Sequence, residues 1–380
     1  MIRSVRDIPT LENVPVLVRA ALNVPIENGA VVNDYRLRRA VPTIEYLAKR
    51  GARVVLISHI GEKGTETLEP VARALGVLTR GVSFCPSTID ARARDAVRNL
   101  HSGSVLVLEN LRRDTGEKDN SSTFAQALAA LGDVFVQDSF DTCHRLHASI
   151  VGVPKYLPSY AGLLLEEEMT ALSQARTPQH PALAVVGGAK FSTKEAVLTT
   201  LLQHYDHVFV GGALANDFLK ASGTPVGKSL VSTTDSSGIQ TILHNPKLVL
   251  PTDVRVVRAS ETPTPTQART APTSDVQSDE LILDSGPQTS ALLATLARDA
   301  KAVLWNGPLG NYENGFVEST DTFANAVAHS SARSVVGGGD TIASIESLGL
   351  LSRFSFVSTG GGAMLDFLAH GTLPGIQALD

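Results

Sequence analysis

The stretch that decides the fold is "VVLISHIG" at residues 54–61, where an apolar run ends in a polar turn. Val54 to Ser58 do not alternate with polar residues, which predicts a strand buried on both faces, as in a parallel sheet. The following turn, "HIGEKG", carries an imidazole, a carboxylate and an ammonium group. Ligands bind beyond the carboxyl ends of strands in such sheets, so the turn is a candidate binding loop.

The same pattern recurs throughout the chain. Other apolar runs that end in polar or glycine-rich turns are "VPVLVRAAL", "SVLVLENLR", "DVFVQDSF", "ALAVVGGAK", "HVFVGGALA", "AVLWNGPLG", "SVVGGGDT" and "FSFVSTGGG". Helical patterns such as "YRLRRAVPTIEYLAKRG" lie between many of them. Because 380 residues exceed one compact core, we predict an α/β protein with two doubly wound parallel-sheet (Rossmann-like) domains.

A helical segment divides the two predicted domains. Leu163 to Ala175 has helical character, and Pro178 and Pro181 follow it. We therefore expect an N-terminal domain over residues 1–162, an interdomain helix over 163–178 and a second domain from 179. Residues 259–279 are rich in Thr and Pro and predict an exposed excursion within the second domain.

Composition narrows the class of protein. The net charge of −5 argues against general nucleic-acid binding, although 17 of 23 arginines precede residue 178. The chain has no run of 18 apolar residues and no apolar signal segment, so we expect a cytoplasmic protein with no membrane association. Cys85 and Cys143 lack the spacing of a disulfide framework or a metal site.

The two halves of the chain end their strands differently. In the first half the strands end in polar side chains, at Asn23, His59, Arg112 and residues 141–145. In the second half most strands end in glycine clusters, at residues 187–188, 211–212, 307, 337–339 and 360–362. This contrast predicts one half that binds a ligand with side chains and another that binds phosphate with backbone N–H groups.

Three charged residues follow strands in the glycine-rich half. If a helix begins at "GGAKFSTK", Lys190 and Lys194 share one face near its positive end, which makes sense when an anion lies between them. Asp340 follows three glycines and is either a Mg²⁺ ligand or a helix N-cap. Together with the lysines it favours the metal, and the half is interpreted as a nucleoside triphosphate site.

In order, these motifs resemble the phosphoglycerate kinase family. They include "SHIG", "LENLR", "CHRLHAS", "GGAKFSTK", "GKSL", "WNGPLG", "VVGGGDT" and "STGGGAMLDFL", and the resemblance runs from about Val16 to Leu379. It implies reversible phosphoryl transfer between Mg-ATP and the carboxylate of 3-phosphoglycerate, with hinge closure of two domains and a monomeric state. It also implies a nucleotide-binding domain over 179–364 and a C-terminal segment, 365–380, that packs on the N-terminal domain.

The resemblance assigns roles in the nucleotide half. The residues it implies for binding nucleotide are Gly188, Lys190, Lys194, Gly211, Gly212, Asn306, Pro308, Glu313, Asp340 and Thr341. Lys190 would hold the transferring phosphoryl group and Asp340 the Mg²⁺ ion. The amides of Gly338, Gly339, Gly361 and Gly362 would also donate to that phosphoryl group.

In the acceptor half the resemblance is mixed. The residues implied to contact the acceptor are Asn23, Arg36, His59, Arg112 and Arg145, with Arg36 at the reacting carboxylate. However, "RAALNVP" stands where the family has R-V-D-F-N-V-P, so a hydroxyl-binding acid becomes Ala21. "SHIGEKG" replaces S-H-L-G-R-P, so a phosphate-binding arginine becomes Glu62, followed by Lys63. "SFDTCHR" replaces A-F-G-T-A-H-R and introduces Asp141 and Cys143.

Two hypotheses follow. The first is an ATP-dependent kinase that forms an acyl phosphate on 3-phosphoglycerate or, because of Ala21 and Glu62, on a related carboxylate. The alternative is a nucleotide-binding paralogue without turnover that acts as a regulator or scaffold. Retention of Arg36, Lys190 and Asp340 favours the kinase.

Overall fold

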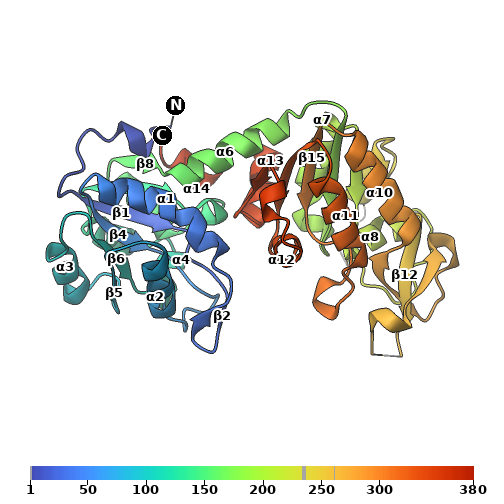
Figure 1. Ribbon diagram of the computed structural model, residues 1–380, viewed down its shortest axis with the longest axis horizontal. Coiled ribbons are helices and arrows are strands. Elements are labelled where there is room, and N and C mark those ends of the chain that lie inside the picture. Colours follow the sequence, from blue (N-terminus) through green and yellow to red (C-terminus); the bar gives the residue numbers. More distant parts are fainter. Residues whose placement is uncertain (1, 233–236, 261) are drawn as a thin grey trace. The chain divides into compact units, whose positions relative to one another are not determined.

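The structure is a computed structural model that describes residues 2–232, 237–260 and 262–380 (Figure 1). The chain divides into two compact units. Unit 1 comprises Met1–Thr170 and Thr372–Asp380, and unit 2 comprises Ala171–Gly371. The division falls inside helix α6 (Leu163–Arg176), so the predicted helix at this place is confirmed.

Unit 1 is built on a six-stranded sheet in the order β5-β6-β4-β1-β7-β8, with every neighbouring pair parallel. The strands are β1 (Pro15–Ala20), β4 (Arg53–Ile57), β5 (Val82–Cys85), β6 (Val105–Leu108), β7 (Val134–Asp138) and β8 (Ser159–Ala161). The helices are α1 (Tyr35–Lys49), α2 (Glu69–Leu78), α3 (Ala91–Arg98), α4 (Thr115–Lys118) and α5 (Ser122–Ala129), and β2 (Ile26–Glu27) pairs with β3 (Ala30–Val31) in a hairpin. The short helix α14 (Pro374–Gln377) completes the unit, where the Gly375 amide donates to the Cys143 carbonyl at 2.8 Å.

The apolar runs of unit 1 form its core. Val54 to Ile57 of β4 have no exposed surface, which matches their unalternated sequence. Helix α1 turns one apolar face inward, with Leu37, Ala40, Ile44 and Leu47 buried at helical spacing. Burial of this kind stabilises the fold by about 25 cal/mol per Å² of apolar surface, and it fixes the ends of the strands from which the polar turns project.

Unit 2 is built on a second six-stranded parallel sheet in the order β11-β10-β9-β15-β16-β17. Its strands are β9 (Ala182–Val186), β10 (His207–Val210), β11 (Leu248–Val249), β15 (Ala302–Asn306), β16 (Arg333–Gly337) and β17 (Phe356–Val357). Its helices are α7 (Glu195–His204), α8 (Ala213–Ala221), α9 (Ser237–Leu243), α10 (Pro287–Asp299), α11 (Glu318–Ala328), α12 (Gly339–Ser347) and α13 (Gly362–His370). The two sheets of parallel strands confirm the predicted fold class.

One expectation for unit 2 is partly wrong. The Thr/Pro-rich residues 259–279 were expected to form only an exposed excursion, but they contain strand β13 (Arg269–Pro272). This strand pairs antiparallel with β12 (Asp253–Arg258), which also pairs with β14 (Glu280–Ser285). Ala271 and Val276 of this segment are buried with Val254 and Val256 in a small apolar cluster, which helps to hold the segment against β12.

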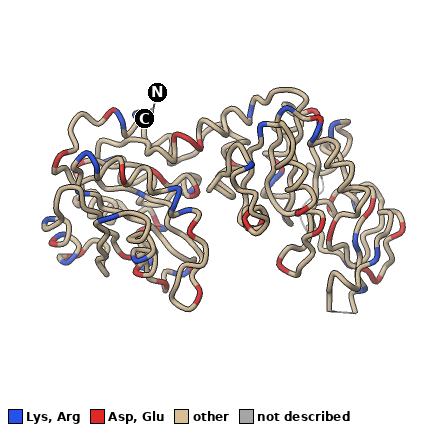
Figure 2. Tube along the Cα trace, viewed as in Figure 1, with Lys and Arg blue, Asp and Glu red and all other residues tan. Residues whose placement is uncertain are grey.

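Charged residues of both signs are interspersed along each unit (Figure 2). Throughout the part of the chain that the structure describes, no helix is both long enough and apolar enough to cross a bilayer.

A buried carboxyl group supports the start of α6. Oδ1 of Asp138, at the end of β7, accepts the backbone N–H groups of Leu164 (3.0 Å) and Leu165 (3.3 Å). Complete burial raises the pKa of Asp138 from 3.8 to about 8, and these hydrogen bonds oppose the rise only in part. The folded chain therefore holds a proton on Asp138 that the unfolded chain releases at neutral pH.

This shift predicts a pH dependence of folding. Protonated Asp138 contributes to the free energy of unfolding. This contribution is fully present below about pH 4 and is lost as the pH rises through about 8, and the free energy of unfolding falls by up to about 1.4 kcal/mol per pH unit. Asp138→Asn, which keeps the oxygen acceptor, should remove this component from the free energy of unfolding measured by chemical denaturation between pH 5 and 8.5. Asp133→Asn, at an exposed position beside the same strand, is the matched control. If the free energy of unfolding has the same slope against pH in the unaltered chain and in Asp138→Asn, the prediction is contradicted.

Candidate active site

In unit 1, polar side chains gather at the carboxyl ends of four adjacent strands, β6, β4, β1 and β7. The predicted acceptor residues lie there: Asn23 follows β1, His59 follows β4, Arg112 follows β6, Arg145 follows β7, and Arg36 is the second residue of α1. We call these five residues the acceptor cluster. The five residues therefore lie at the carboxyl edge of the sheet, as the sequence predicts.

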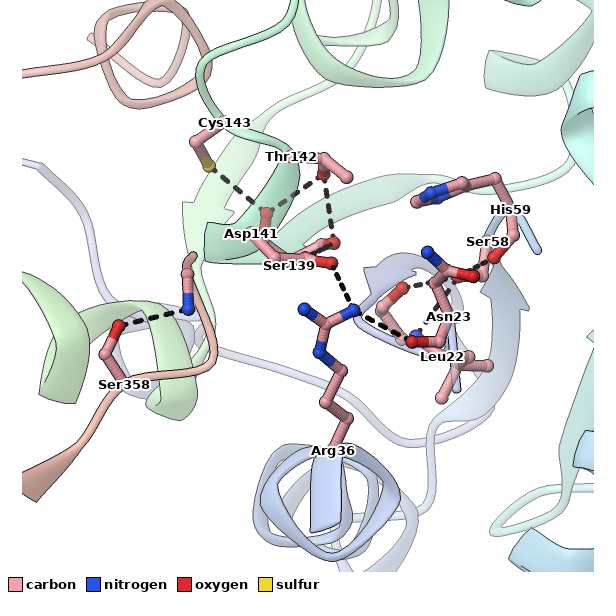
Figure 3. Close-up of polar contacts among 12 residues, drawn as sticks. Leu22, Asn23, Arg36, Ser58, His59, Ser139, Asp141, Thr142, Cys143 and Ser358 are labelled. Carbon is pink, nitrogen blue, oxygen red and sulfur yellow. Dashed lines mark hydrogen bonds and ion pairs between the residues drawn. The ribbon is translucent and has the colours of Figure 1, made fainter. Parts of the chain in front are cut away.

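Specific hydrogen bonds hold several members in place. Arg36 Nη1 donates to the Asn23 carbonyl at 2.8 Å, and Asn23 Oδ1 accepts the Gly61 N–H at 3.1 Å (Figure 3). Arg112 Nη1 donates to the Gly61 carbonyl at 2.5 Å. The loop after β4 is thus attached both to the turn after β1 and to Arg112, while Arg145 is exposed on the segment after β7.

Arg19, which no motif of the sequence pointed to, organises this edge. Arg19 stands inside the apolar strand β1, is 1% exposed, and donates from Nη1 to the Ala20 carbonyl at 2.8 Å. Its Nη2 lies 3.0 Å from Nδ1 of His59. A charged residue in the middle of an otherwise apolar run was the available signal, because such a residue is buried only with polar partners.

The contact with Arg19 determines the form of His59. A guanidinium group only donates, so Nδ1 of His59 accepts and the ring proton resides on Nε2. Burial, followed by the charges of Arg19, Arg112 and Arg36, lowers the pKa of His59 well below 6.5. His59 is therefore a neutral hydrogen-bond donor at physiological pH.

The positions that depart from the family pattern are also resolved. Ala21 is 1% exposed and offers only a methyl group. The Glu62 side chain is 86% exposed, with Oε2 3.2 Å from Nη1 of Arg112, whose side chain is 7% exposed. Lys118 Nζ donates to the Glu62 carbonyl at 2.7 Å. The carboxylate of Glu62 therefore lies beside Arg112, a cation of the acceptor cluster. The Lys118 ammonium group lies close to the same loop, and the next residue, Lys63, is exposed.

Unit 2 contains a cavity of about 520 Å³ beside the carboxyl ends of its strands. Five of the predicted nucleotide residues line it: Gly188, Gly212, Pro308, Glu313 and Asp340. Apolar side chains, including Leu219, Leu281 and Leu283, line it as well. A slot with apolar walls, glycine backbone and a carboxylate at its edge suits a base, a ribose and phosphates.

The other predicted nucleotide residues lie outside the lining of this cavity: Lys190, Lys194, Gly211, Asn306, Gly338, Gly339, Thr341, Gly361 and Gly362. Lys194 is still close to it, because a Cβ built on Gly188 would lie 3.1 Å from Lys194 Nζ. Thr341 is buried, and its Oγ1 accepts the Gly307 N–H at 3.0 Å, so it supports the loop after β15 from within the unit.

One expectation about a helix start is wrong, and one of the two alternatives for Asp340 is excluded. Helix α7 begins at Glu195, so Lys190 and Lys194 precede it on a connecting segment rather than sharing a helical face. Asp340 is not an N-cap, since Gly338 occupies that position and no side chain caps α12. Between β9 and α7 two glycines and a short 3₁₀ turn (Phe191–Thr193) delay the helix until Glu195, whereas α12 begins at Gly339, directly after Gly338.

The glycines at the starts of α12 and α13 fit a bound phosphate. A Cβ built on Gly339 or Gly362 would meet no atom within 4 Å, so packing within the protein does not require glycine at either position. The open space lies at the N-termini of two helices, where N–H groups favour an anion. Among the residues that the structure describes, no three His, Cys, Asp or Glu side chains form a metal site. One carboxylate such as Asp340 together with phosphate oxygens suffices for Mg²⁺.

Comparison with known proteins gives the family. The sequence model of phosphoglycerate kinase matches residues 5–371. The chain belongs to the phosphoglycerate kinase family. The phosphoglycerate kinases of Xanthobacter flavus and Pelotomaculum thermopropionicum are each 42% identical to it, over 99% of this chain and 98% of theirs.

Solved structures agree with this membership. The phosphoglycerate kinase of Coxiella burnetii has a TM-score of 0.84 at 40% identity and covers 100% of this chain and 99% of its own. That of Pyrococcus horikoshii has a TM-score of 0.88 at 31% identity, over 100% and 98%. The family predicted from the ordered motifs is therefore confirmed, and with it the class of enzyme, an ATP-dependent phosphotransferase with a carboxyl acceptor.

The open space around Gly362 predicts that a substitution there impairs phosphate binding without impairing folding. Gly362→Ala should leave the midpoint of thermal unfolding unchanged or slightly higher, because alanine is the better helix former. The affinity for a non-hydrolysable ATP analogue with Mg²⁺, measured by calorimetric titration, should fall about tenfold or more, because the added methyl group occupies the phosphate position. Gly76→Ala, on an exposed face of α2, is the matched control. Unchanged affinity in Gly362→Ala would show that phosphate does not approach this amide.

Proposed function

We propose that this protein transfers the γ-phosphoryl group of Mg-ATP reversibly to the carboxylate of 3-phosphoglycerate and so forms 1,3-bisphosphoglycerate and ADP. The observation that carries the proposal is the acceptor cluster, in which cationic and neutral donors meet at one sheet edge of a phosphoglycerate kinase family member. Such a cluster suits a substrate with two anionic groups. Both sequence-based alternatives, another carboxylate acceptor and a paralogue without turnover, gain no support from the relatives.

The chemistry requires little beyond positioning. A carboxylate oxygen of the acceptor attacks the γ-phosphorus, a new O–P bond forms, and the bond from that phosphorus to the β-γ bridging oxygen breaks to release ADP. The nucleophile is already ionised, so no side chain has to remove a proton. We therefore assign the residues to charge neutralisation and orientation.

We assign Arg36 and Lys190 to the charges of the reacting groups. Arg36 is oriented by the Asn23 carbonyl, so its guanidinium is preorganised for a carboxylate. Neutral His59 donates from Nε2, and Arg112 and Arg145 supply cations for the distal phosphate. In unit 2 the amides of Gly338, Gly339, Gly361 and Gly362 donate to phosphate oxygens, and Lys194 is placed beside Gly188 for the same purpose.

Gly211, Gly212, Asn306, Pro308 and Glu313 are assigned to the nucleoside, with Thr341 supporting them through Gly307. A magnesium ion held by Asp340 would neutralise phosphate charge. Small-molecule substrates and a monomeric state complete the proposal.

The test is release of ADP from Mg-ATP and 3-phosphoglycerate in a coupled assay with the purified chain. We expect turnover that depends on both substrates and falls at least about 100-fold in Lys190→Met, the order expected when a transition-state charge contact is removed. This variant, purified in parallel, also measures any contaminating host enzyme. Equal rates for the two proteins, or no ADP release from the unaltered chain, would refute the proposal.

Glu62 gives a second prediction. Its carboxylate competes for Arg112 and repels an anionic ligand, but it is exposed, so its effect should be modest. Glu62→Gln should lower KM for 3-phosphoglycerate about threefold to tenfold with little change in kcat. Glu69→Gln removes a carboxylate from an exposed pair with Arg73 and should leave KM unchanged. A KM that stays constant or rises in Glu62→Gln would contradict the prediction.

A further inference from the structure

We propose that Asp141 determines acceptor specificity by accepting a hydrogen bond from the hydroxyl group on carbon 2 of 3-phosphoglycerate. This inference rests on the proposed function. Asp141 belongs to a short 3₁₀ helix (Phe140–Thr142) after β7 and is 9% exposed. Its carboxylate lies close to Arg36 of the acceptor cluster (Figure 3).

Both oxygens of Asp141 have defined surroundings. Oδ1 accepts from Ser139 Oγ at 2.5 Å, and Ser139 Oγ lies 3.3 Å from Nη1 of Arg19. Oδ2 lies 3.5 Å from Nη1 of Arg36, the nitrogen that donates to the Asn23 carbonyl. The carboxylate therefore contacts Ser139, which adjoins Arg19, and lies close to Arg36 and the turn that follows β1. Ser139, Arg36 and Asn23 can be followed in Figure 3.

The chemistry of the acceptor indicates what Asp141 binds. 3-Phosphoglycerate has a carboxylate, a phosphate and one hydroxyl group, and only the hydroxyl can donate a hydrogen bond at neutral pH. The arginines and His59 serve the two anionic groups. Asp141 only accepts, and each of its oxygens has two lone-pair positions. The distance of 3.5 Å to Arg36 is longer than a strong charge-assisted hydrogen bond, which leaves Oδ2 able to accept the hydroxyl.

Position supports the same assignment. If Arg36 binds the reacting carboxylate, the hydroxyl on the adjacent carbon lies within one side-chain length of Arg36, where Asp141 is found. Ala21, in the turn after β1, presents no polar side-chain atom that could serve instead.

A purely electrostatic role is the competing explanation. The charge of Asp141 helps to keep Arg19 protonated, although burial lowers the pKa of Arg19. Glu117 does the same from another direction and is the stronger of the two. Its carboxylate accepts from Ser149 Oγ at 2.6 Å and the Ser149 N–H at 2.9 Å, and Ser149 Oγ accepts from Arg19 Nε at 3.1 Å. Glu117 therefore provides a control that shares the electrostatic role without the contact with Arg36.

The experiment compares kcat/KM for 3-phosphoglycerate with that for its 2-deoxy analogue, 3-phosphooxypropanoate. The ratio of the two values isolates the hydroxyl group, because general losses of stability or of phosphate binding affect both substrates. We expect the unaltered chain to prefer 3-phosphoglycerate about 10- to 100-fold, the range of a hydrogen bond to a charged acceptor.

Three variants assign the preference. In Asp141→Gly the ratio should fall to within about threefold of unity. In Asp141→Asn it should also fall below that of the unaltered chain, because the one remaining oxygen accepts from Ser139 and an NH₂ group replaces Oδ2. Glu117→Gln should keep the ratio of the unaltered chain even where its overall rate falls. Asp141→Asn preserves size and the Ser139 contact, so it decides the question if the glycine variant does not fold.

The outcomes separate the two proposals. Turnover of 3-phosphoglycerate with the same ratio in the unaltered chain and both Asp141 variants would overturn this inference alone. A ratio that falls equally in Glu117→Gln and in the Asp141 variants would overturn it in favour of the electrostatic role. Absence of turnover in the unaltered chain would overturn the proposed function, and the inference with it.

Discussion

The acceptor site depends on one buried cation. The buried guanidinium of Arg19 contacts the ends of three strands, through the Ala20 carbonyl, Ser58 Oγ and Ser139 Oγ. A buried charge is costly unless it is hydrogen-bonded, so these contacts offset the cost of burying Arg19. The contacts with Arg19 also fix the positions of the loops after β1, β4 and β7, which contain Asn23, His59 and Arg145 of the acceptor cluster.

The candidate sites of the two units are built by different physical means. In unit 1 long side chains are oriented by neighbouring carbonyl groups, as Arg36 is by Asn23. In unit 2 the chain itself comes close, and a Cβ built on Gly187 would lie 2.0 Å from the Pro308 carbonyl oxygen. Side chains tolerate exchange by similar groups, whereas such backbone contact tolerates none. The departures from the family pattern at Ala21, Glu62 and Asp141 fall in unit 1, where side chains form the candidate site.

Much of the fold could be predicted from the sequence. Apolar runs without alternation identified the strands of both parallel sheets, and their polar or glycine ends identified the binding edge. The starts of the helices could not be predicted in the glycine-rich turns, because glycine permits several backbone paths and only packing selects one. Strand β13 was missed because a single buried residue, Ala271, gives no periodic signal.

The candidate site was predictable to a similar extent. Residue types at strand ends pointed to the acceptor cluster, and the ordered motifs gave the family. The roles of Arg19 and of the contact between Asp141 and Arg36 could not be predicted, because they join segments separated by more than a hundred residues. Such pairings depend on the order of strands in the sheet, which no local pattern encodes.

The docking of α14 also has a consequence for how the chain is made. Residues 372–380 belong to unit 1, although unit 2 is synthesised between them and the rest of that unit. Ile376 and Leu379 are buried in it, and the Gly375 amide binds the Cys143 carbonyl. The first 170 residues are therefore synthesised before the last buried residues of their unit, and the segment that contains Asp141 and Cys143 acquires its final packing only after unit 2 has been synthesised.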